Sequence, residues 1–263
     1  MKLSRRGECI TLKFNIIWDK ENYSEFLLEL EKLQDHRYRS FCQRLNKDEN
    51  YDYIGVRVPI LRDIAKQIAK YDFQSFIRQN THTYYEETML HGFILGYADL
   101  ELKSLLKMLK EYIQHVSNWS LVDLVIVKFK SIVKNKTEGF SGILEFSKSS
   151  NPWEVRMALV LLLSLYVEEK YIEEILSVCS SINKNHLCCL KNSDDKIPYY
   201  VNMANAWLLS ECYLKFPEKV TKLFKEKALS PQVHNKAIQK IRESWRVNNC
   251  LKNNLKDLKI KLN

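Results

Sequence analysis

Apolar residues at helical spacing recur along almost the whole chain, and this pattern constrains the fold more than any other feature. In residues 59–72, Ile60, Ile64 and Ile68 stand one helical turn apart, and Pro59 suits the first turn of a helix. The 263 residues include only 6 Gly and 5 Pro, which leaves few turn signals for a protein of many strands. The sequence therefore predicts an all-α protein.

The expected helices follow one another closely, and pairs of them recur about every 35–45 residues, a period typical of HEAT repeats. This spacing predicts a curved solenoid of HEAT-like antiparallel helix pairs, an α-α superhelix, in a single domain. We expect an N-terminal extension at 1–17, the repeat domain at 18–248 and a polar C-terminal tail at 249–263. The segments 197–216 and 230–246 begin near prolines, and 151–167 begins with the N-cap candidate Asn151. The segments with helical spacing are 23–44, 59–72, 84–98, 101–116, 118–133, 151–167, 197–216 and 230–246.

The chain is basic, with 41 Lys and Arg against 32 Asp and Glu and a formal net charge of +9. Such a balance suits a polyanionic partner, most often nucleic acid, with an anionic membrane or a merely solvated lysine surface as alternatives. No apolar stretch is long enough to span a membrane, and the start of the chain lacks a signal-peptide pattern. The seven cysteines show no disulfide-scaffold pattern, so we expect a cytoplasmic protein, nucleoid-associated if bacterial.

One carboxylate, Asp123, interrupts the otherwise nearly apolar segment 117–132. An unpaired carboxylate buried there would cost several kcal/mol, on the order of the stability of a whole domain. We therefore expect either that a partner neutralises Asp123, or that it faces a cleft and acts there.

Three helical segments place a tryptophan near a polar residue. Trp119 and Asp123 are spaced i, i+4, and Trp153 and Arg156 are spaced i, i+3, so each pair shares a helix face; Trp207 is the third tryptophan. Taken singly, each tryptophan fits a core position, and Asp123 with Arg156 could form a buried ion pair. Taken together, a carboxylate, a guanidinium and several indoles in a basic helical protein suit a nucleic-acid site, where arginine binds phosphate and indoles pack on sugars or bases.

Five motifs, in this order, resemble the DNA alkylation repair family typified by AlkD, whose members are HEAT-like-repeat DNA glycosylases. The resemblance runs from about Tyr38 to Arg246. It rests on the motifs YIGVRVPILRDIAK, NWSLVD, NPWEVRMAL, YYVNMANAWLLSECYLKFPEK and HNKAIQKIRESWR.

The resemblance implies a role for several positions. Asp123 corresponds to the catalytic carboxylate, Arg156 to an arginine that contacts the DNA backbone, and Trp119 and Trp207 to indoles that pack on the damaged nucleotide. Trp153 belongs to the same motif as Arg156. The family removes cationic bases, so the leaving base needs little acid catalysis and a carboxylate beside the sugar is the main requirement.

The sequence departs from the family at three places. Active members have Trp-Trp where this chain has Asn118-Trp119, and a lysine-containing run where it has 202–204, Asn-Met-Ala. The N-terminal tyrosine that grips the nucleotide in the family has only Phe41 or Tyr38 as candidates.

Two further groups of side chains carry chemistry that suits a binding site. Lys236 and Lys240 lie on one face of the last predicted helix and suit a stripe that binds the DNA backbone, or else a solvated exterior. A cluster formed by Cys179, His186, Cys188 and Cys189 lacks metal-ligand spacing, so we expect no metal, and no nucleotide-binding motif indicates a cofactor.

The sequence thus predicts a DNA glycosylase that removes N3- or N7-alkylated purines from duplex DNA, with no obligate protein partner. Two alternatives stay open. One is a non-catalytic helical-repeat protein that binds branched or distorted DNA, and the other is a protein-binding HEAT scaffold.

Overall fold

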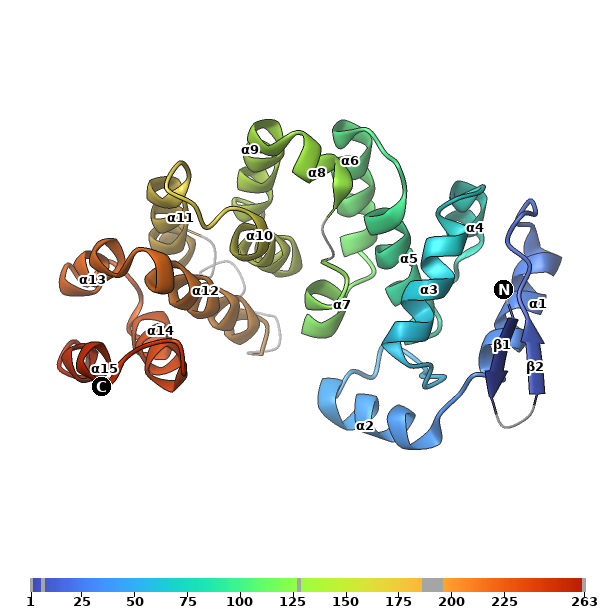
Figure 1. Cartoon of the computed structure of the whole chain (residues 1–263), viewed down its shortest axis with the longest axis horizontal. Coiled ribbons are helices and arrows are strands. Elements are labelled where there is room, and N and C mark those ends of the chain that lie inside the picture. The colour runs from blue at the N-terminus through green and yellow to red at the C-terminus, as the bar shows by residue number, and fades with distance from the viewer. Residues whose placement is uncertain (1, 6–7, 127–128, 186–195, 262–263) are drawn as a thin grey trace. The chain divides into compact units, whose positions relative to one another are not determined.

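Helices make up nearly all the regular structure of the chain. The computed structural model describes residues 2–5, 8–126, 129–185 and 196–261. Contacts divide the chain into two compact units, Met1–Asn135 (unit 1) and Lys136–Asn263 (unit 2). Within the described residues, the only strands are β1 (Lys2–Arg5) and β2 (Glu8–Thr11), which pair as an antiparallel hairpin (Figure 1). The prediction of an all-α, HEAT-like fold is confirmed apart from this small hairpin.

Unit 1 is built around α5, which lies between α3 and α6 (Figure 1). Nearly every residue of α5 is buried, because neighbouring elements cover it on several sides. At the other end of the unit, the rings of Trp18, Phe26 and Phe76 pack edge to face with centroids 4.9 to 5.5 Å apart. The helices of unit 1 are α1 (Lys20–Glu31), α2 (His36–Asn46), α3 (Val58–Ile68), α4 (Phe73–Gln79), α5 (Tyr85–Tyr97), α6 (Leu102–Ile113), α7 (Trp119–Asp123) and α8 (Lys130–Lys134).

The helical pattern predicted over 23–44 is divided between two helices. Helix α1 ends at Glu31, and α2 starts after Asp35, whose Oδ1 accepts hydrogen bonds from the backbone N–H groups of Arg37 and Tyr38 at 3.1 and 3.2 Å. An aspartate side chain that satisfies the first free N–H groups favours a new helix start over continuation of the old helix.

The helix predicted over 118–133 is also wrong as a single element. Helix α7 ends at Asp123 after five residues, and α8 begins at Lys130. A straight helix would expose one side of this almost uniformly apolar run. The broken path instead buries Leu121, Val125 and Phe129.

In unit 2, α12 lies between α10 and α14 (Figure 1). Asn151 caps α10 as predicted, since its Oδ1 accepts from the N–H of Trp153 at 2.9 Å. Part of the predicted polar tail forms α15, and just beyond it Asn235 of α14 exchanges two hydrogen bonds with the backbone of Ile260. The predicted domain boundaries stay predictions. The helices of unit 2 are α9 (Lys136–Ser147), α10 (Pro152–Leu165), α11 (Ile172–Asn185), α12 (Lys196–Lys215), α13 (Pro217–Lys225), α14 (Pro231–Glu243) and α15 (Asn249–Lys256).

Among the described residues, no helix combines the length and the apolar character that a bilayer span requires.

Candidate functional site

The short helix α7 carries the first predicted pair, Trp119 at its first position and Asp123 at its last. Both side chains are partly exposed, in contrast to Leu121 and Val122 between them, which are fully buried. Because Trp119 and Asp123 are one turn apart, the indole and the carboxylate share the face of α7 that solvent reaches. Both expectations for Asp123, a neutralising partner or a place in a cleft, stay predictions.

The start of α7 is held by Asn118. Its Oδ1 accepts from the backbone N–H groups of Ser120 and Leu121 at 3.1 and 3.3 Å, so Asn118 is the N-cap of the helix. Its Nδ2 donates to Oδ2 of Asp48 at 2.6 Å. The same Oδ2 atom accepts from the hydroxyl of Ser117.

The middle and the end of α7 have their own anchors in other helices of unit 1. The hydroxyl of Tyr112 in α6 donates to the carbonyl oxygen of Leu121 at 2.7 Å. Nη2 of Arg62 in α3 donates to the carbonyl oxygen of Leu124, directly after Asp123, at 3.1 Å. A five-residue helix has little stability of its own, so these contacts determine where Trp119 and Asp123 lie.

In unit 2, the second predicted pair lies in the first turn of α10. Trp153 is buried, and its ring packs on that of Tyr200 with centroids 5.7 Å apart. Arg156 is also buried, and its Nη1 donates to the carbonyl oxygen of Tyr200 at 2.5 Å. Arg156 is therefore held by α12, on which Trp207 also lies, partly exposed.

Helix α14 carries two more of the predicted cations, Lys236 and Lys240. Burial lowers the pKa of Lys240, the positive charges of Lys236 and Arg156 lower it further, and the negative charge of Glu243 opposes them. Lys236 donates from Nζ to Oε1 of Gln239 at 3.2 Å. Lys236 and Arg156 each repel the ammonium group of Lys240, and an anion bound beside Lys240 would add to the attraction that Glu243 supplies.

The structure thus groups the predicted residues within each unit. Unit 1 holds Trp119 with Asp123, and unit 2 holds the remaining predicted residues. The predicted ion pair between Asp123 and Arg156 would join residues of different units, and it stays a prediction. The predicted site residues that lie in unit 2 are Trp153, Arg156, Trp207, Lys236 and Lys240.

The two aromatic candidates for gripping a nucleotide, Tyr38 and Phe41, lie on α2. The rings of Tyr38 and Phe41 are stacked with centroids 6.2 Å apart, and Phe41 is 49% exposed. The guanidinium of Arg57 lies over the Tyr38 ring at 5.3 Å from its centroid. Phe41 is therefore the more accessible of the two rings.

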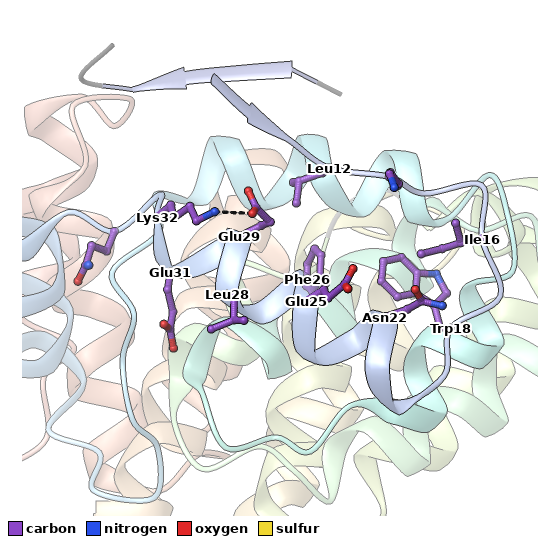
Figure 2. A pocket seen from close by; sticks show the side chains of 12 residues that line it. Leu12, Ile16, Trp18, Asn22, Glu25, Phe26, Leu28, Glu29, Glu31 and Lys32 are labelled. Carbon is purple, nitrogen blue, oxygen red and sulfur yellow. Dashed lines mark hydrogen bonds and ion pairs between the residues drawn. The ribbon is translucent and has the colours of Figure 1, made fainter. Parts of the chain in front are cut away.

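A groove of about 730 Å³ runs along α1 (Figure 2). Its wall includes the carboxylates of Glu25, Glu29 and Glu31, with Lys32 paired to Glu29 at 2.5 Å. None of the predicted site residues lines this groove. Its three carboxylates outnumber the two lysines of its lining, Lys13 and Lys32, so the groove offers no net positive charge to DNA.

Sequence reasoning missed Asp48 and Arg62, which lie 70 and 62 residues from the groups they contact. No local signal marks either residue. The N-cap role of Asn118 could have been predicted, because asparagine before a helix is a common cap.

Within the described part of the chain, no group of three or more His, Cys, Asp or Glu side chains is arranged to hold a metal ion. Of the four residues considered as a metal cluster, Cys179 is buried and free, and His186, Cys188 and Cys189 lie outside the described residues.

Comparison with known proteins places the chain in a family. The family model described as DNA alkylation repair enzyme matches residues 26–241, which include every predicted site residue in both units. A search of curated proteins gives no match. The match covers well over half of the chain, and the chain therefore belongs to the family of DNA alkylation repair enzymes.

Proposed function

We propose that the protein is a DNA glycosylase that hydrolyses the N-glycosidic bond of N3- or N7-alkylated purines in duplex DNA. The observation that carries this proposal is the pairing of a partly exposed carboxylate, Asp123, with the indole of Trp119 on one face of α7, in a chain of a DNA alkylation repair family. The positive net charge supports DNA as the partner.

The chemistry explains why a carboxylate suffices. An N3- or N7-alkylated purine is a cation, so when the bond from C1′ to the base nitrogen breaks, the base takes the electron pair and leaves neutral. Positive charge then develops on the sugar, and a carboxylate close to C1′ stabilises it. Water adds to C1′ and loses a proton, which gives an abasic site, the free base and one proton.

The remaining residues supply binding in this proposal. Arg156, Lys236 and Lys240 bind phosphate oxygens, and Trp119 and Trp207 pack on the damaged nucleotide. The buried position of Arg156 supports a fixed rather than a mobile guanidinium, because its contact with Tyr200 holds it. We also propose a cytoplasmic location for the protein, which its cysteine pattern suggests.

The test is release of methylated bases from duplex DNA carrying N7-methylguanine and N3-methyladenine, by the parent protein and by Asp123→Asn. We expect Asp123→Asn to lower the release rate by about 100-fold or more, since it removes the charge that stabilises the transition state. Its affinity for DNA should be equal or higher, because one repulsion with phosphate is lost.

Asp63→Asn is the matched control, because Asp63 is an exposed carboxylate of unit 1 that pairs with Lys66 at 2.9 Å. Release at the parent rate is expected. If the parent binds DNA tightly in a salt-dependent way but releases no base, the glycosylase proposal is wrong, and the alternative of a non-catalytic DNA-binding protein replaces it.

A further inference from the structure

We infer that Asp48 is a positioning residue. Acting through Asn118, it holds α7 in the place where Trp119 and Asp123 serve the proposed reaction. This inference rests on the proposed function for its catalytic part, whereas the hold on α7 can be tested without any activity.

The Asn118 amide has to adopt one particular orientation. An asparagine side chain has one acceptor and one donor end, and capping α7 requires the acceptor to face the helix. The donor end then faces Oδ2 of Asp48 at 2.6 Å, so the carboxylate fixes the amide in the capping orientation. Asn118 is 2% exposed, so water does not compete freely for this contact.

Asp48 is itself held by hydrogen bonds to both of its carboxylate oxygens. Its Oδ1 accepts from the backbone N–H and from Nδ2 of Asn50, at 3.0 and 2.8 Å. Its Oδ2 accepts from Ser117 as well as from Asn118. A carboxylate that accepts from four donors has little freedom to move. It joins the loop after α2 to the turn before α7.

Helix α7 is too short to be stable without contacts to its ends. Five residues cannot maintain a helix alone, and the carboxylate of Asp123 lies at the end opposite the cap. A loosened start therefore moves the indole, and it leaves Tyr112 and Arg62 as the only named anchors for the end that carries Asp123. Proximity effects are steep, and a displacement of about 1 Å can cost about 100-fold in rate.

The experiment compares Asp48→Ala, Asn118→Ala, the double variant and the parent. Two quantities are measured: the single-turnover rate of N7-methylguanine release, and the affinity for a duplex with a tetrahydrofuran abasic analogue. We expect Asp48→Ala to lower the rate by about 10- to 100-fold while the affinity stays within about threefold. Asp48→Ala should slow the Asn118→Ala variant by less than it slows the parent, because Asp48 acts mainly through Asn118 and keeps only its contact with Ser117 when Asn118 is replaced.

Tyr23→Phe is the matched control, since it removes another hydrogen bond of unit 1, from the Tyr23 hydroxyl to Oε1 of Glu87 at 2.6 Å. It should lower stability and leave the release rate unchanged. If Asp48→Ala does not fold, Asp48→Asn replaces it, because asparagine keeps one acceptor and should give a smaller loss of rate. A parent rate in the Asp48 variant overturns the inference.

Hydrogen exchange at the amides of Ser120 and Leu121 separates this inference from the proposed function. Both amides donate to Asn118, so they should exchange faster in Asp48→Ala than in Tyr23→Phe at matched global stability. If the parent releases no base, the glycosylase proposal fails while faster exchange still supports the hold on α7. Unchanged exchange overturns the role of Asp48 whatever the activity.

Discussion

Gly92 of α5 lies so close to Val125 that a side chain could not be added to it without a displacement. A Cβ at Gly92 would meet Cγ1 of Val125, would lie 2.8 Å from its Cγ2, and would lie 2.9 Å from Cζ of Tyr112. Val125 follows α7 by two residues, so the absent side chain at position 92 lets the end of α7 pack against α5.

Gly92→Ala should lower the free energy of unfolding by about 1–3 kcal/mol, the usual cost of overpacking a core. Urea denaturation measures it. In the background Val125→Ala, which removes both methyl groups, the same substitution at Gly92 should cost clearly less. An equal cost in both backgrounds would show that the contact with Val125 is not what excludes alanine.

Glu86→Gln should lower the free energy of unfolding by about 1–3 kcal/mol, because a buried N–H would lose its acceptor. Oε1 of Glu86 accepts from the backbone N–H groups of Gly55 and Val56 at 2.7 and 3.2 Å, and Oε2 accepts from Ile54 at 3.0 Å. Glutamine offers one acceptor and turns a donor toward the other N–H groups.

Thermal and urea unfolding of Glu86→Gln beside Glu138→Gln, an exposed glutamate on α9, would check this. Equal stability of the two variants would mean that the carboxylate of Glu86 is dispensable to the loop at 54–56.

The protein should lose stability as the pH falls below about 6.5, through its buried histidines. The rings of His82 and His115 stack with centroids 3.6 Å apart, and the ring of His91 lies 5.3 Å from that of His82. Burial, and then the neighbouring histidines, lower the pKa of His82 and His91 to about 3. The folded state therefore binds protons less readily than the unfolded state, so the stabilisation is complete above about 6.5 and is lost as the pH falls toward 3.

At pH 5, one such histidine accounts for a loss of about 2 kcal/mol. His91→Phe should therefore lose less stability than the parent between pH 7 and pH 5 in urea titrations. His36→Phe, at an exposed position on α2, is the control and should follow the parent. An unchanged pH dependence in His91→Phe would contradict this assignment.

Local signals predicted six helices as separate elements, because helix starts depend on neighbouring residues: α3, α5, α6, α10, α12 and α14. They did not mark α4, α9, α11, α13 or α15. The N-cap candidate Asn151 does cap α10, through the backbone N–H of Trp153 two residues later. The paired residues Trp119 and Asp123 were found for the same reason, since their spacing is itself local.

The surroundings of α7 could not be predicted in this way. Its length depends on which apolar faces are covered, and its position depends on Asp48 and Arg62, which are distant in sequence. A pattern of apolar residues shows that a segment is buried, but it does not show where the chain bends to achieve that burial. The break at Asp123 is therefore a tertiary effect.

Lys240→Gln should weaken DNA binding and reduce its salt dependence, if the cations of unit 2 contact phosphates as proposed. Each phosphate contact adds about 0.9 to the slope of the logarithm of affinity against the logarithm of salt concentration. Loss of one contact should reduce the slope by about that amount, and the affinity should fall most at low salt.

Lys222→Gln is the control, because Lys222 is an exposed lysine of α13 that lies 3.9 Å from Glu226. Fluorescence titrations over a series of salt concentrations would separate the two variants. Identical slopes would place Lys240 outside the DNA contact and leave Arg156 as the cation to test next.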